Sequence, residues 1–288
     1  MKNLSFAFLL FLLLSGCTNS GLSSDKEVIT VSIEPFSFFV KEIAGSAYEV
    51  NIIVPSGASP ATYEPPPSVV RSMSNSDMLV INGYLGFEMA WIDRLIKANP
   101  GVKTLKLSEN QDLIAADSHR HGDIIHYTGV DPHFWVSPVA AAIIARDIRD
   151  FLISNHPERK DVFIDNYLRL DSVIRHTDKY VSSLIEKSGA KAFMIFHPSL
   201  TYLARDYGLE QIPVEMEGKE PSPSELKRLI DKGRERQIDA IFVQREFDRT
   251  NADLIAREIG AEAIVIDPLS SNWVNSVSEI AEYISGEK

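Results

Sequence analysis

A segment of about 30 residues without glycine or proline divides the chain into two parts and constrains its fold more than any other feature. It runs from Glu158 to Lys187, and apolar residues recur in it at steps of three, four or seven: Phe163, Tyr167, Leu170, Ile174, Val181 and Leu184. This periodicity predicts a single helix, roughly 45 Å long at 1.5 Å per residue. We expect such a helix to act as a rigid spine between the two parts.

Short apolar segments alternate with helical patterns on both sides of this helix. We expect strands at 28–33, 50–54, 77–82, 102–107, 191–196, 211–215, 240–243 and 263–266. We expect helices at 36–44, 67–74, 87–98, 138–155, 200–207, 223–236, 249–259 and 272–284. Strands that alternate with helices at this spacing indicate βα units. The predicted fold class is therefore α/β, with two lobes joined by one long spine helix, each lobe a mainly parallel four-stranded sheet with flanking helices.

The first residues have the layout of an export signal. Lys2 is followed by an apolar run from Leu4 to Leu14, which is too short to span a bilayer. Leu14-Ser-Gly-Cys17 ends this run and resembles the bacterial lipobox, in which the cysteine is acylated after cleavage. Cys17 is the only cysteine, and a free thiol is unusual in an exported protein. We expect a lipoprotein on the outer side of a bacterial membrane, periplasmic or at the cell surface, anchored through Cys17.

Composition supports a simple domain division after this signal. Residues 1–17 form the predicted signal peptide, and the small polar residues 18–26 a flexible tether. An N-terminal lobe at 27–156, the linking helix at 157–188 and a C-terminal lobe at 189–288 follow. The formal net charge of −11 argues against nucleic acid as a partner. We expect a monomer.

Three polar residues precede or follow a proline where a strand or loop ends. His197 and Asp267 each come directly after an apolar strand, and His133 lies in Asp131-Pro132-His133. In open α/β sheets, ligands bind beyond the carboxyl ends of the strands. Two imidazoles and a carboxylate suit zinc, or secondarily manganese. The sequence therefore predicts a metal site formed by His133, His197 and Asp267.

Motifs along nearly the whole chain resemble those of the zinc- and manganese-binding lipoproteins that serve ABC importers. They are Gly57-Ala-Ser-Pro60 with Thr62-Tyr-Glu-Pro65, Asn82-Gly83 with Glu88 and Trp91, Asp131-Pro-His-Phe-Trp-Val-Ser-Pro138, Phe196-His-Pro198, Tyr202-Leu-Ala-Arg-Asp-Tyr-Gly-Leu209, Glu220-Pro-Ser-Pro223 and Ile266-Asp-Pro-Leu269. The resemblance implies a metal held in the cleft between two lobes, with His133, His197 and Asp267 as ligands. It also implies Zn²⁺ or Mn²⁺ as the cargo, a membrane ABC permease as the partner, and no enzymatic activity.

One position departs from this family pattern. The family usually has a histidine, its first metal ligand, where this chain has Ala61. Three explanations stay open: His126 completes the shell, a water or anion fills the open position, or the ligand has become another metal or a small metal chelate. Loss of a group that only orients a ligand typically costs about 10–100-fold in metal affinity. An unreplaced imidazole should cost at least as much.

The polar segment between Ser108 and Val130 contains His119, His121 and His126. Family members often have a histidine- and acid-rich insertion here, and this segment is a sparse version of it. Two other functions remain as alternatives: a surface adhesin with a vestigial metal site, and an exported metallohydrolase. The hydrolase is disfavoured because the chain has neither a His-Glu-x-x-His nor a Gly-x-Ser-x-Gly motif.

Overall fold

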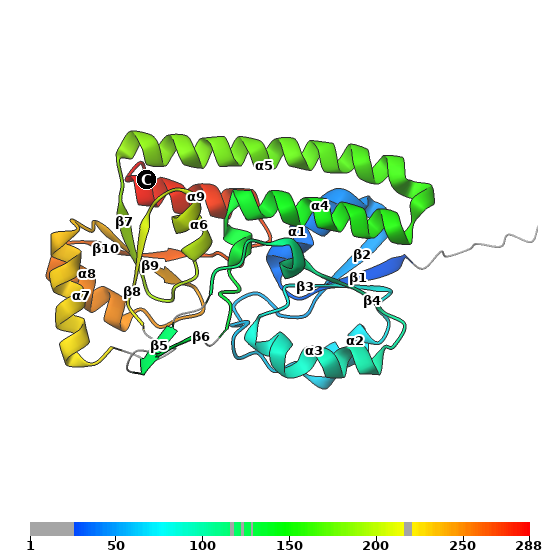
Figure 1. Cartoon of the computed structure of the whole chain (residues 1–288), viewed down its shortest axis with the longest axis horizontal. Coiled ribbons are helices and arrows are strands. Elements are labelled where there is room, and N and C mark those ends of the chain that lie inside the picture. Colours follow the sequence, from blue (N-terminus) through cyan, green and yellow to red (C-terminus); the bar gives the residue numbers. More distant parts are fainter. Residues whose placement is uncertain (1–25, 116–117, 122–123, 128, 216–220) are drawn as a thin grey trace, which may run out of the picture.

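The computed structural model describes residues 26–115, 118–121, 124–127, 129–215 and 221–288 (Figure 1). The predicted signal peptide with Cys17, and nearly all of the predicted tether, lie outside these residues. Within the described ranges, none of the helices combines the length and the apolar character needed to cross a membrane.

The N-terminal lobe is built on a four-stranded sheet with strand order β2-β1-β3-β4. All of its neighbouring strands are parallel. The strands are β1 (Glu27–Val31), β2 (Tyr48–Ile52), β3 (Met78–Ile81) and β4 (Lys103–Lys106), and the helices between them are α1 (Glu34–Ala44), α2 (Pro67–Met73) and α3 (Gly86–Ala98). β1 and β3 are the central strands, and β3 is buried along its whole length, as a strand covered on both faces requires.

The C-terminal lobe repeats this plan with strand order β10-β9-β7-β8, again wholly parallel. Its strands are β7 (Ala192–Ile195), β8 (Glu210–Pro213), β9 (Ala240–Gln244) and β10 (Glu262–Ile266), and its helices are α6 (Thr201–Asp206), α7 (Pro223–Glu235), α8 (Thr250–Ile259) and α9 (Trp273–Ser285). The predicted fold class, two mainly parallel four-stranded lobes, is confirmed.

Helix α5 (Lys160–Ser188) is the predicted spine, and it lies along both lobes (Figure 1). Its 29 residues pack against α1 and α4 (Pro138–Asn155) of the first lobe and against α9 of the second. The side chains that make these contacts are buried at helical spacing: Phe163, Leu170, Ile174, Val181 and Leu184. The helix ends at Gly189, whose φ of 68° lies in the left-handed region that favours glycine.

Two buried tryptophans connect the lobes directly. The indole N–H of Trp135 donates to the carbonyl of Pro268 at 2.9 Å, and the indole N–H of Trp273 donates to the carbonyl of Trp135 at 2.7 Å. Both side chains are at most 2% exposed, and they belong to one apolar cluster that extends through both lobes. The two lobes therefore share a core, in addition to the spine helix.

The polar segment between Ser108 and Val130 contains a short antiparallel hairpin that the sequence analysis does not predict. Its strands are β5 (Ser118–His121) and β6 (Ile124–Tyr127), and their register sets His119 opposite His126. The sequence does carry a hairpin signal here: β-branched and aromatic residues in 124–127, and Gly122-Asp123 between the two strands. The hairpin itself is therefore a finding of the structure.

Candidate metal centre

The first imidazole, that of His133, is held by its own segment of chain. The backbone N–H of His133 donates to Oδ1 of Asp131 at 2.9 Å, and Nδ1 lies 2.8 Å from the same oxygen. Burial alone would raise the pKa of the Asp131 carboxyl, but the hydrogen bonds and charge of His133 outweigh it and lower that pKa below its ordinary value. Asp131 therefore remains a carboxylate and orients the ring.

The turn after β3 anchors this segment. The side-chain amide of Asn82 donates to the carbonyl of Pro132 at 2.8 Å. Glu88, only 1% exposed, accepts hydrogen bonds from the backbone N–H groups of Asn82 at 2.9 Å and Gly83 at 2.5 Å. Burial raises the pKa of Glu88, although these backbone donors lower it in part. The Asn82-Gly83 and Glu88 motif thus has a structural role in positioning the backbone beside His133.

The second imidazole, that of His197, lies just beyond the end of β7. Its Nδ1 is 2.5 Å from Oε1 of Glu215, a residue only 6% exposed. The Gln244 side chain fixes the backbone at this point, because its amide N–H group donates to the carbonyl of His197 at 2.5 Å and to the Ser199 hydroxyl at 2.6 Å. His197 is therefore fixed at its ring and at its main chain.

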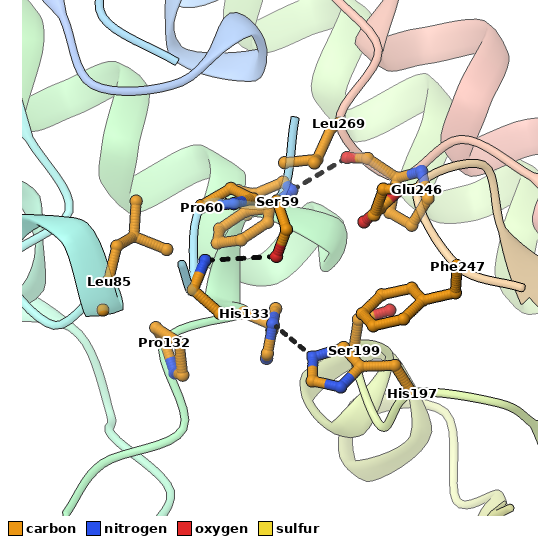
Figure 2. A pocket seen from close by; sticks show the side chains of 14 residues that line it. Ser59, Pro60, Leu85, Pro132, His133, His197, Ser199, Glu246, Phe247 and Leu269 are labelled. Atoms are coloured by element: carbon orange, nitrogen blue, oxygen red, sulfur yellow. Dashed lines mark hydrogen bonds between the residues drawn. The ribbon is translucent and has the colours of Figure 1, made fainter. Parts of the chain in front are cut away.

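The two imidazoles meet between the lobes. The Nε2 atoms of His133 and His197 are 3.4 Å apart, and their rings are inclined at 75° (Figure 2). Each Nδ1 faces a carboxylate, so the proton of a neutral ring resides on Nδ1 and the lone pair on Nε2. Two lone pairs that face each other at this distance repel unless a cation lies between them. This arrangement is suited to a shared metal ion.

A cavity of about 220 Å³ opens in front of these two nitrogen atoms. Its wall is mostly apolar, and it is formed by both lobes: Ser59, Pro60, Ala61, Leu85, Gly86, Pro132, Trp135, Ser199, Glu246, Phe247, Pro268 and Leu269 surround the two histidines. The ring of Phe247 stacks on the imidazole of His197 at a centroid distance of 5.0 Å. An apolar wall lowers the local dielectric constant and strengthens the attraction between a cation and its ligands.

Ala61 lies in this wall, at the position for which the family pattern expects a histidine. Its loop is pressed against the start of α3: the backbone N–H of Phe87 donates to the carbonyl of Pro60 at 3.0 Å. A Cβ atom added to Gly86 would lie 2.1 Å from the Ala61 carbonyl oxygen, so only glycine permits this approach. The loop is in place, but its side chain carries no donor atom.

Asp267, the third predicted ligand, faces elsewhere. Its carboxylate lies 3.2 Å from Nη1 of Arg245. It lines a neighbouring cavity with Arg245, whereas Pro268 and Leu269, which follow it, line the cavity of the histidines. Among the described residues no three or more His, Cys, Asp or Glu side chains are grouped to hold a metal ion. The structure brings His133 and His197 together, and Asp267 as a ligand stays a prediction. The side chain of His126 lies outside what the structure describes.

Glu246 is a cavity residue that the sequence analysis missed. It lies in the loop after β9 and lines the same cavity as both histidines. Burial raises the pKa of its carboxyl, and the nearby Asp267 raises it further, while His197 acts in the opposite direction. No motif marks Gln244-Arg-Glu-Phe247, and its only signal is its position at the carboxyl end of a parallel strand.

The chain has two lobes with parallel sheets, one helix that spans both lobes, and a pair of histidines between them. These features define a class of two-lobed metal receptors, and solved structures of such proteins resemble it. The crystal structure of a ZnuA protein matches with a TM-score of 0.85 and 32% identity, over 91% of this chain and 99% of that one. A Cd-bound periplasmic metal binding protein from Candidatus Liberibacter asiaticus matches at a TM-score of 0.77 and 21% identity, which shows the shared fold.

Residues 29–285 match the family described as zinc-uptake complex component A, periplasmic, and the chain belongs to that family. The resemblance drawn from its motifs is thereby confirmed, and the family is one of transport components and not of enzymes. Zinc-binding lipoprotein AdcA of Streptococcus pneumoniae strain R6 is 28% identical over 99% of this chain, but the match spans only 59% of that protein. High-affinity zinc uptake system protein ZnuA of Bacillus subtilis is 26% identical over 90% of this chain and 85% of that protein.

Proposed function

We propose that this protein is the extracytoplasmic receptor of a zinc importer. It captures Zn²⁺ between its lobes, with Nε2 of His133 and Nε2 of His197 as ligands, and delivers the ion to an ABC permease in the membrane. The names of its relatives, a zinc-binding lipoprotein and a zinc uptake protein, support this assignment.

The distance between the two Nε2 atoms is the observation that carries the proposal. Zn–N bonds of about 2.0–2.1 Å at a tetrahedral angle separate two ligand nitrogens by about 3.3 Å. The observed separation is 3.4 Å. The carboxylates of Asp131 and Glu215 hold the opposite ring nitrogens, as metal-bound imidazoles require. The pair therefore needs little rearrangement to bind zinc.

The donor atoms favour zinc over manganese. Imidazole nitrogen suits zinc, whereas manganese is bound preferentially by carboxylate, carbonyl and water oxygens. Both ligands that the structure brings together are imidazoles. Manganese is the second choice, as the sequence analysis predicts.

The size of the cavity favours a second candidate cargo, a zinc ion that arrives bound to a small organic chelator. A volume of about 220 Å³ exceeds what one bare ion needs, since a site of roughly 10–15 Å³ already holds a water molecule. The mostly apolar wall would contact the organic part. Tighter binding of zinc in the presence of a chelator such as free histidine than in its absence would select this candidate.

We also propose attachment to the membrane through lipid on Cys17, which the lipobox-like sequence before it and the name of the AdcA relative support. Incorporation of radiolabelled palmitate into the expressed protein, and its loss in Cys17→Ala, tests this anchor. The anchor places the receptor beside the permease that it would serve.

Titration of the metal-free protein with Zn²⁺ against a competing chelator tests the receptor function. We expect one zinc ion per chain, bound with sub-micromolar affinity, and a loss of at least about 100-fold in His133→Ala and in His197→Ala. His156→Ala, at the end of α4 and away from the cavity, serves as the control. Equal binding by all three variants would exclude the proposed site.

A further inference from the structure

We infer that Glu246 is a zinc ligand of this protein, a protein donor that takes over from the imidazole missing at Ala61. The inference rests on the proposed zinc-receptor function and deepens it by naming a residue that completes the site. Its support is the position, the environment and the lack of side-chain partners of this carboxylate among the described residues.

The position of Glu246 is fixed on both sides. Gln244, at the end of β9, is bonded to the His197 segment, and the backbone N–H of Phe247 donates back to the carbonyl of Gln244 at 3.0 Å. Phe247 in turn stacks on the ring of His197. Glu246 is held in the turn between these two contacts, and Figure 2 shows it across the cavity from His133. The loop thus places Glu246 in the wall of the cavity that both histidines line, and its side chain must turn toward the two Nε2 atoms to share a metal ion with them.

Two acidic residues, Asp267 and Glu246, lie near the histidines, and their carboxylates differ in what they contact. Asp267 is paired with Arg245 at 3.2 Å, and Arg245 is directed to solvent with 59% of its side chain exposed. Glu246 has no ion pair or hydrogen bond to another side chain within the described ranges. Its environment is partly desolvated, and the Asp267 charge repels its own. The backbone N–H of Glu246, His197 and Arg245 offset this cost only in part, because the pKa of the half-buried carboxyl is still raised, and a bound cation would offset the rest.

Coordination chemistry explains how a carboxylate at Glu246 can serve in place of the histidine that is missing at Ala61. Zinc sites commonly combine two or three imidazoles with one carboxylate, and the two imidazoles that the structure brings together would bind zinc weakly on their own. Ala61 and Glu246 lie in the wall of the same cavity but belong to different lobes. A carboxylate from the C-terminal lobe can therefore take over the coordination that the N-terminal lobe lacks. His133 would remain the ligand from the N-terminal lobe, and His197 and Glu246 would come from the C-terminal lobe.

A double-mutant cycle of zinc affinities tests this inference. The variants are Glu246→Gln, Ala61→His and the two combined, with Glu235→Gln, an exposed residue at the end of α7, as the matched control. Glu246→Gln should weaken zinc binding at least about 10-fold, and Glu235→Gln should leave it unchanged. Because Ala61→His supplies the histidine that the family usually has, the double variant should recover most of the lost affinity. Far-ultraviolet circular dichroism and thermal melts of the metal-free variants establish that each is folded.

Two results would overturn the inference. The first is wild-type affinity in Glu246→Gln. The second is an equal loss from Glu246→Gln in both backgrounds, alanine and histidine at 61, since additive effects denote a remote charge and not a ligand. Neither result affects the receptor function, which fails only if His133→Ala and His197→Ala also leave zinc binding unchanged. Visible absorption of the Co²⁺-loaded protein gives a second readout, because removal of a ligand changes the ligand-field bands.

Discussion

Nε2 of His133 and Nε2 of His197 lie 3.4 Å apart, although the two residues are 64 positions apart in the chain. One imidazole comes from the segment before α4 and the other from the end of β7, so the pair exists only when both lobes are in place. Each ring is oriented by a carboxylate, Asp131 in one case and Glu215 in the other. The proposed metal centre is therefore a property of the interface between the lobes, and its stability depends on what holds them together.

Replacing Glu215 tests how far the orientation of His197 matters. Glu215→Gln keeps the shape of the side chain but removes the charge that polarises the imidazole. We expect zinc affinity to fall about 10–100-fold with little change in fold, measured by chelator competition. Glu258→Gln, an exposed change on α8, should have no effect on zinc affinity. Wild-type affinity in Glu215→Gln would show that the contact is not needed for metal binding.

The lowered pKa of Asp131 predicts a pH dependence of stability. Its contribution to the free energy of unfolding is present above the unfolded-state pKa of about 3.9 and is lost as the pH falls through the lower folded-state value. Asp131→Asn should therefore be less stable than wild type near neutral pH, and the difference should shrink as the pH falls below about 4. Urea unfolding of the metal-free proteins over this pH range measures both.

The exposed variant Asp150→Asn is the control for this experiment, because the Asp150 side chain is 57% exposed. A stability difference between wild type and Asp131→Asn that stayed constant down to strongly acidic pH would contradict the account of Asp131.

Gly86 sets the position of the loop that contains Ala61. In Gly86→Ala the new Cβ would lie 2.1 Å from the Ala61 carbonyl oxygen, so either the loop or the start of α3 must move. We expect a loss of about 1–3 kcal/mol in the free energy of unfolding, together with weaker zinc binding. Gly101→Ala has its nearest contact at 3.9 Å and should be nearly neutral, and equal effects of both changes would refute this reading.

The tryptophan contacts between the lobes should contribute measurably to stability. Trp273→Phe removes the N–H that donates to the carbonyl of Trp135 and leaves that buried oxygen without this partner. We expect a loss of about 1–3 kcal/mol in the free energy of unfolding, measured by denaturant titration. Trp91→Phe, at a partly exposed position stacked by Arg94, should cost less, and a reversed order would contradict the shared core.

Much of this fold is predictable from local sequence because the chain follows simple rules. The periodic, glycine-free segment predicts α5 within two residues at its start and one at its end, and apolar runs predict all eight strands of the two sheets. Gly45, Gly189 and Gly260 follow the helices that they end. The hairpin of β5 and β6 was not predicted because its strands are only four residues each and the first, Ser118–His121, is wholly polar.

The site is predictable only in part. His133 and His197 are marked by the prolines next to them and by the resemblance to a known family, and the structure brings them together. No sequence motif marks the pairing of Asp267 with Arg245 or the cavity position of Glu246, because both depend on how the loops after β9 and β10 pack together. The family's histidine donor is absent at Ala61, and no residue next to it in the sequence marks a replacement; Glu246 is proposed because it lines the same cavity.

Anomalous diffraction at the zinc absorption edge, from crystals of the zinc-loaded protein, tests the central claim most directly. The account predicts one strong peak between the two imidazoles, about 2.0–2.1 Å from Nε2 of His133 and from Nε2 of His197. A fully occupied zinc ion elsewhere, or one bound to only one of these two histidines, would contradict it.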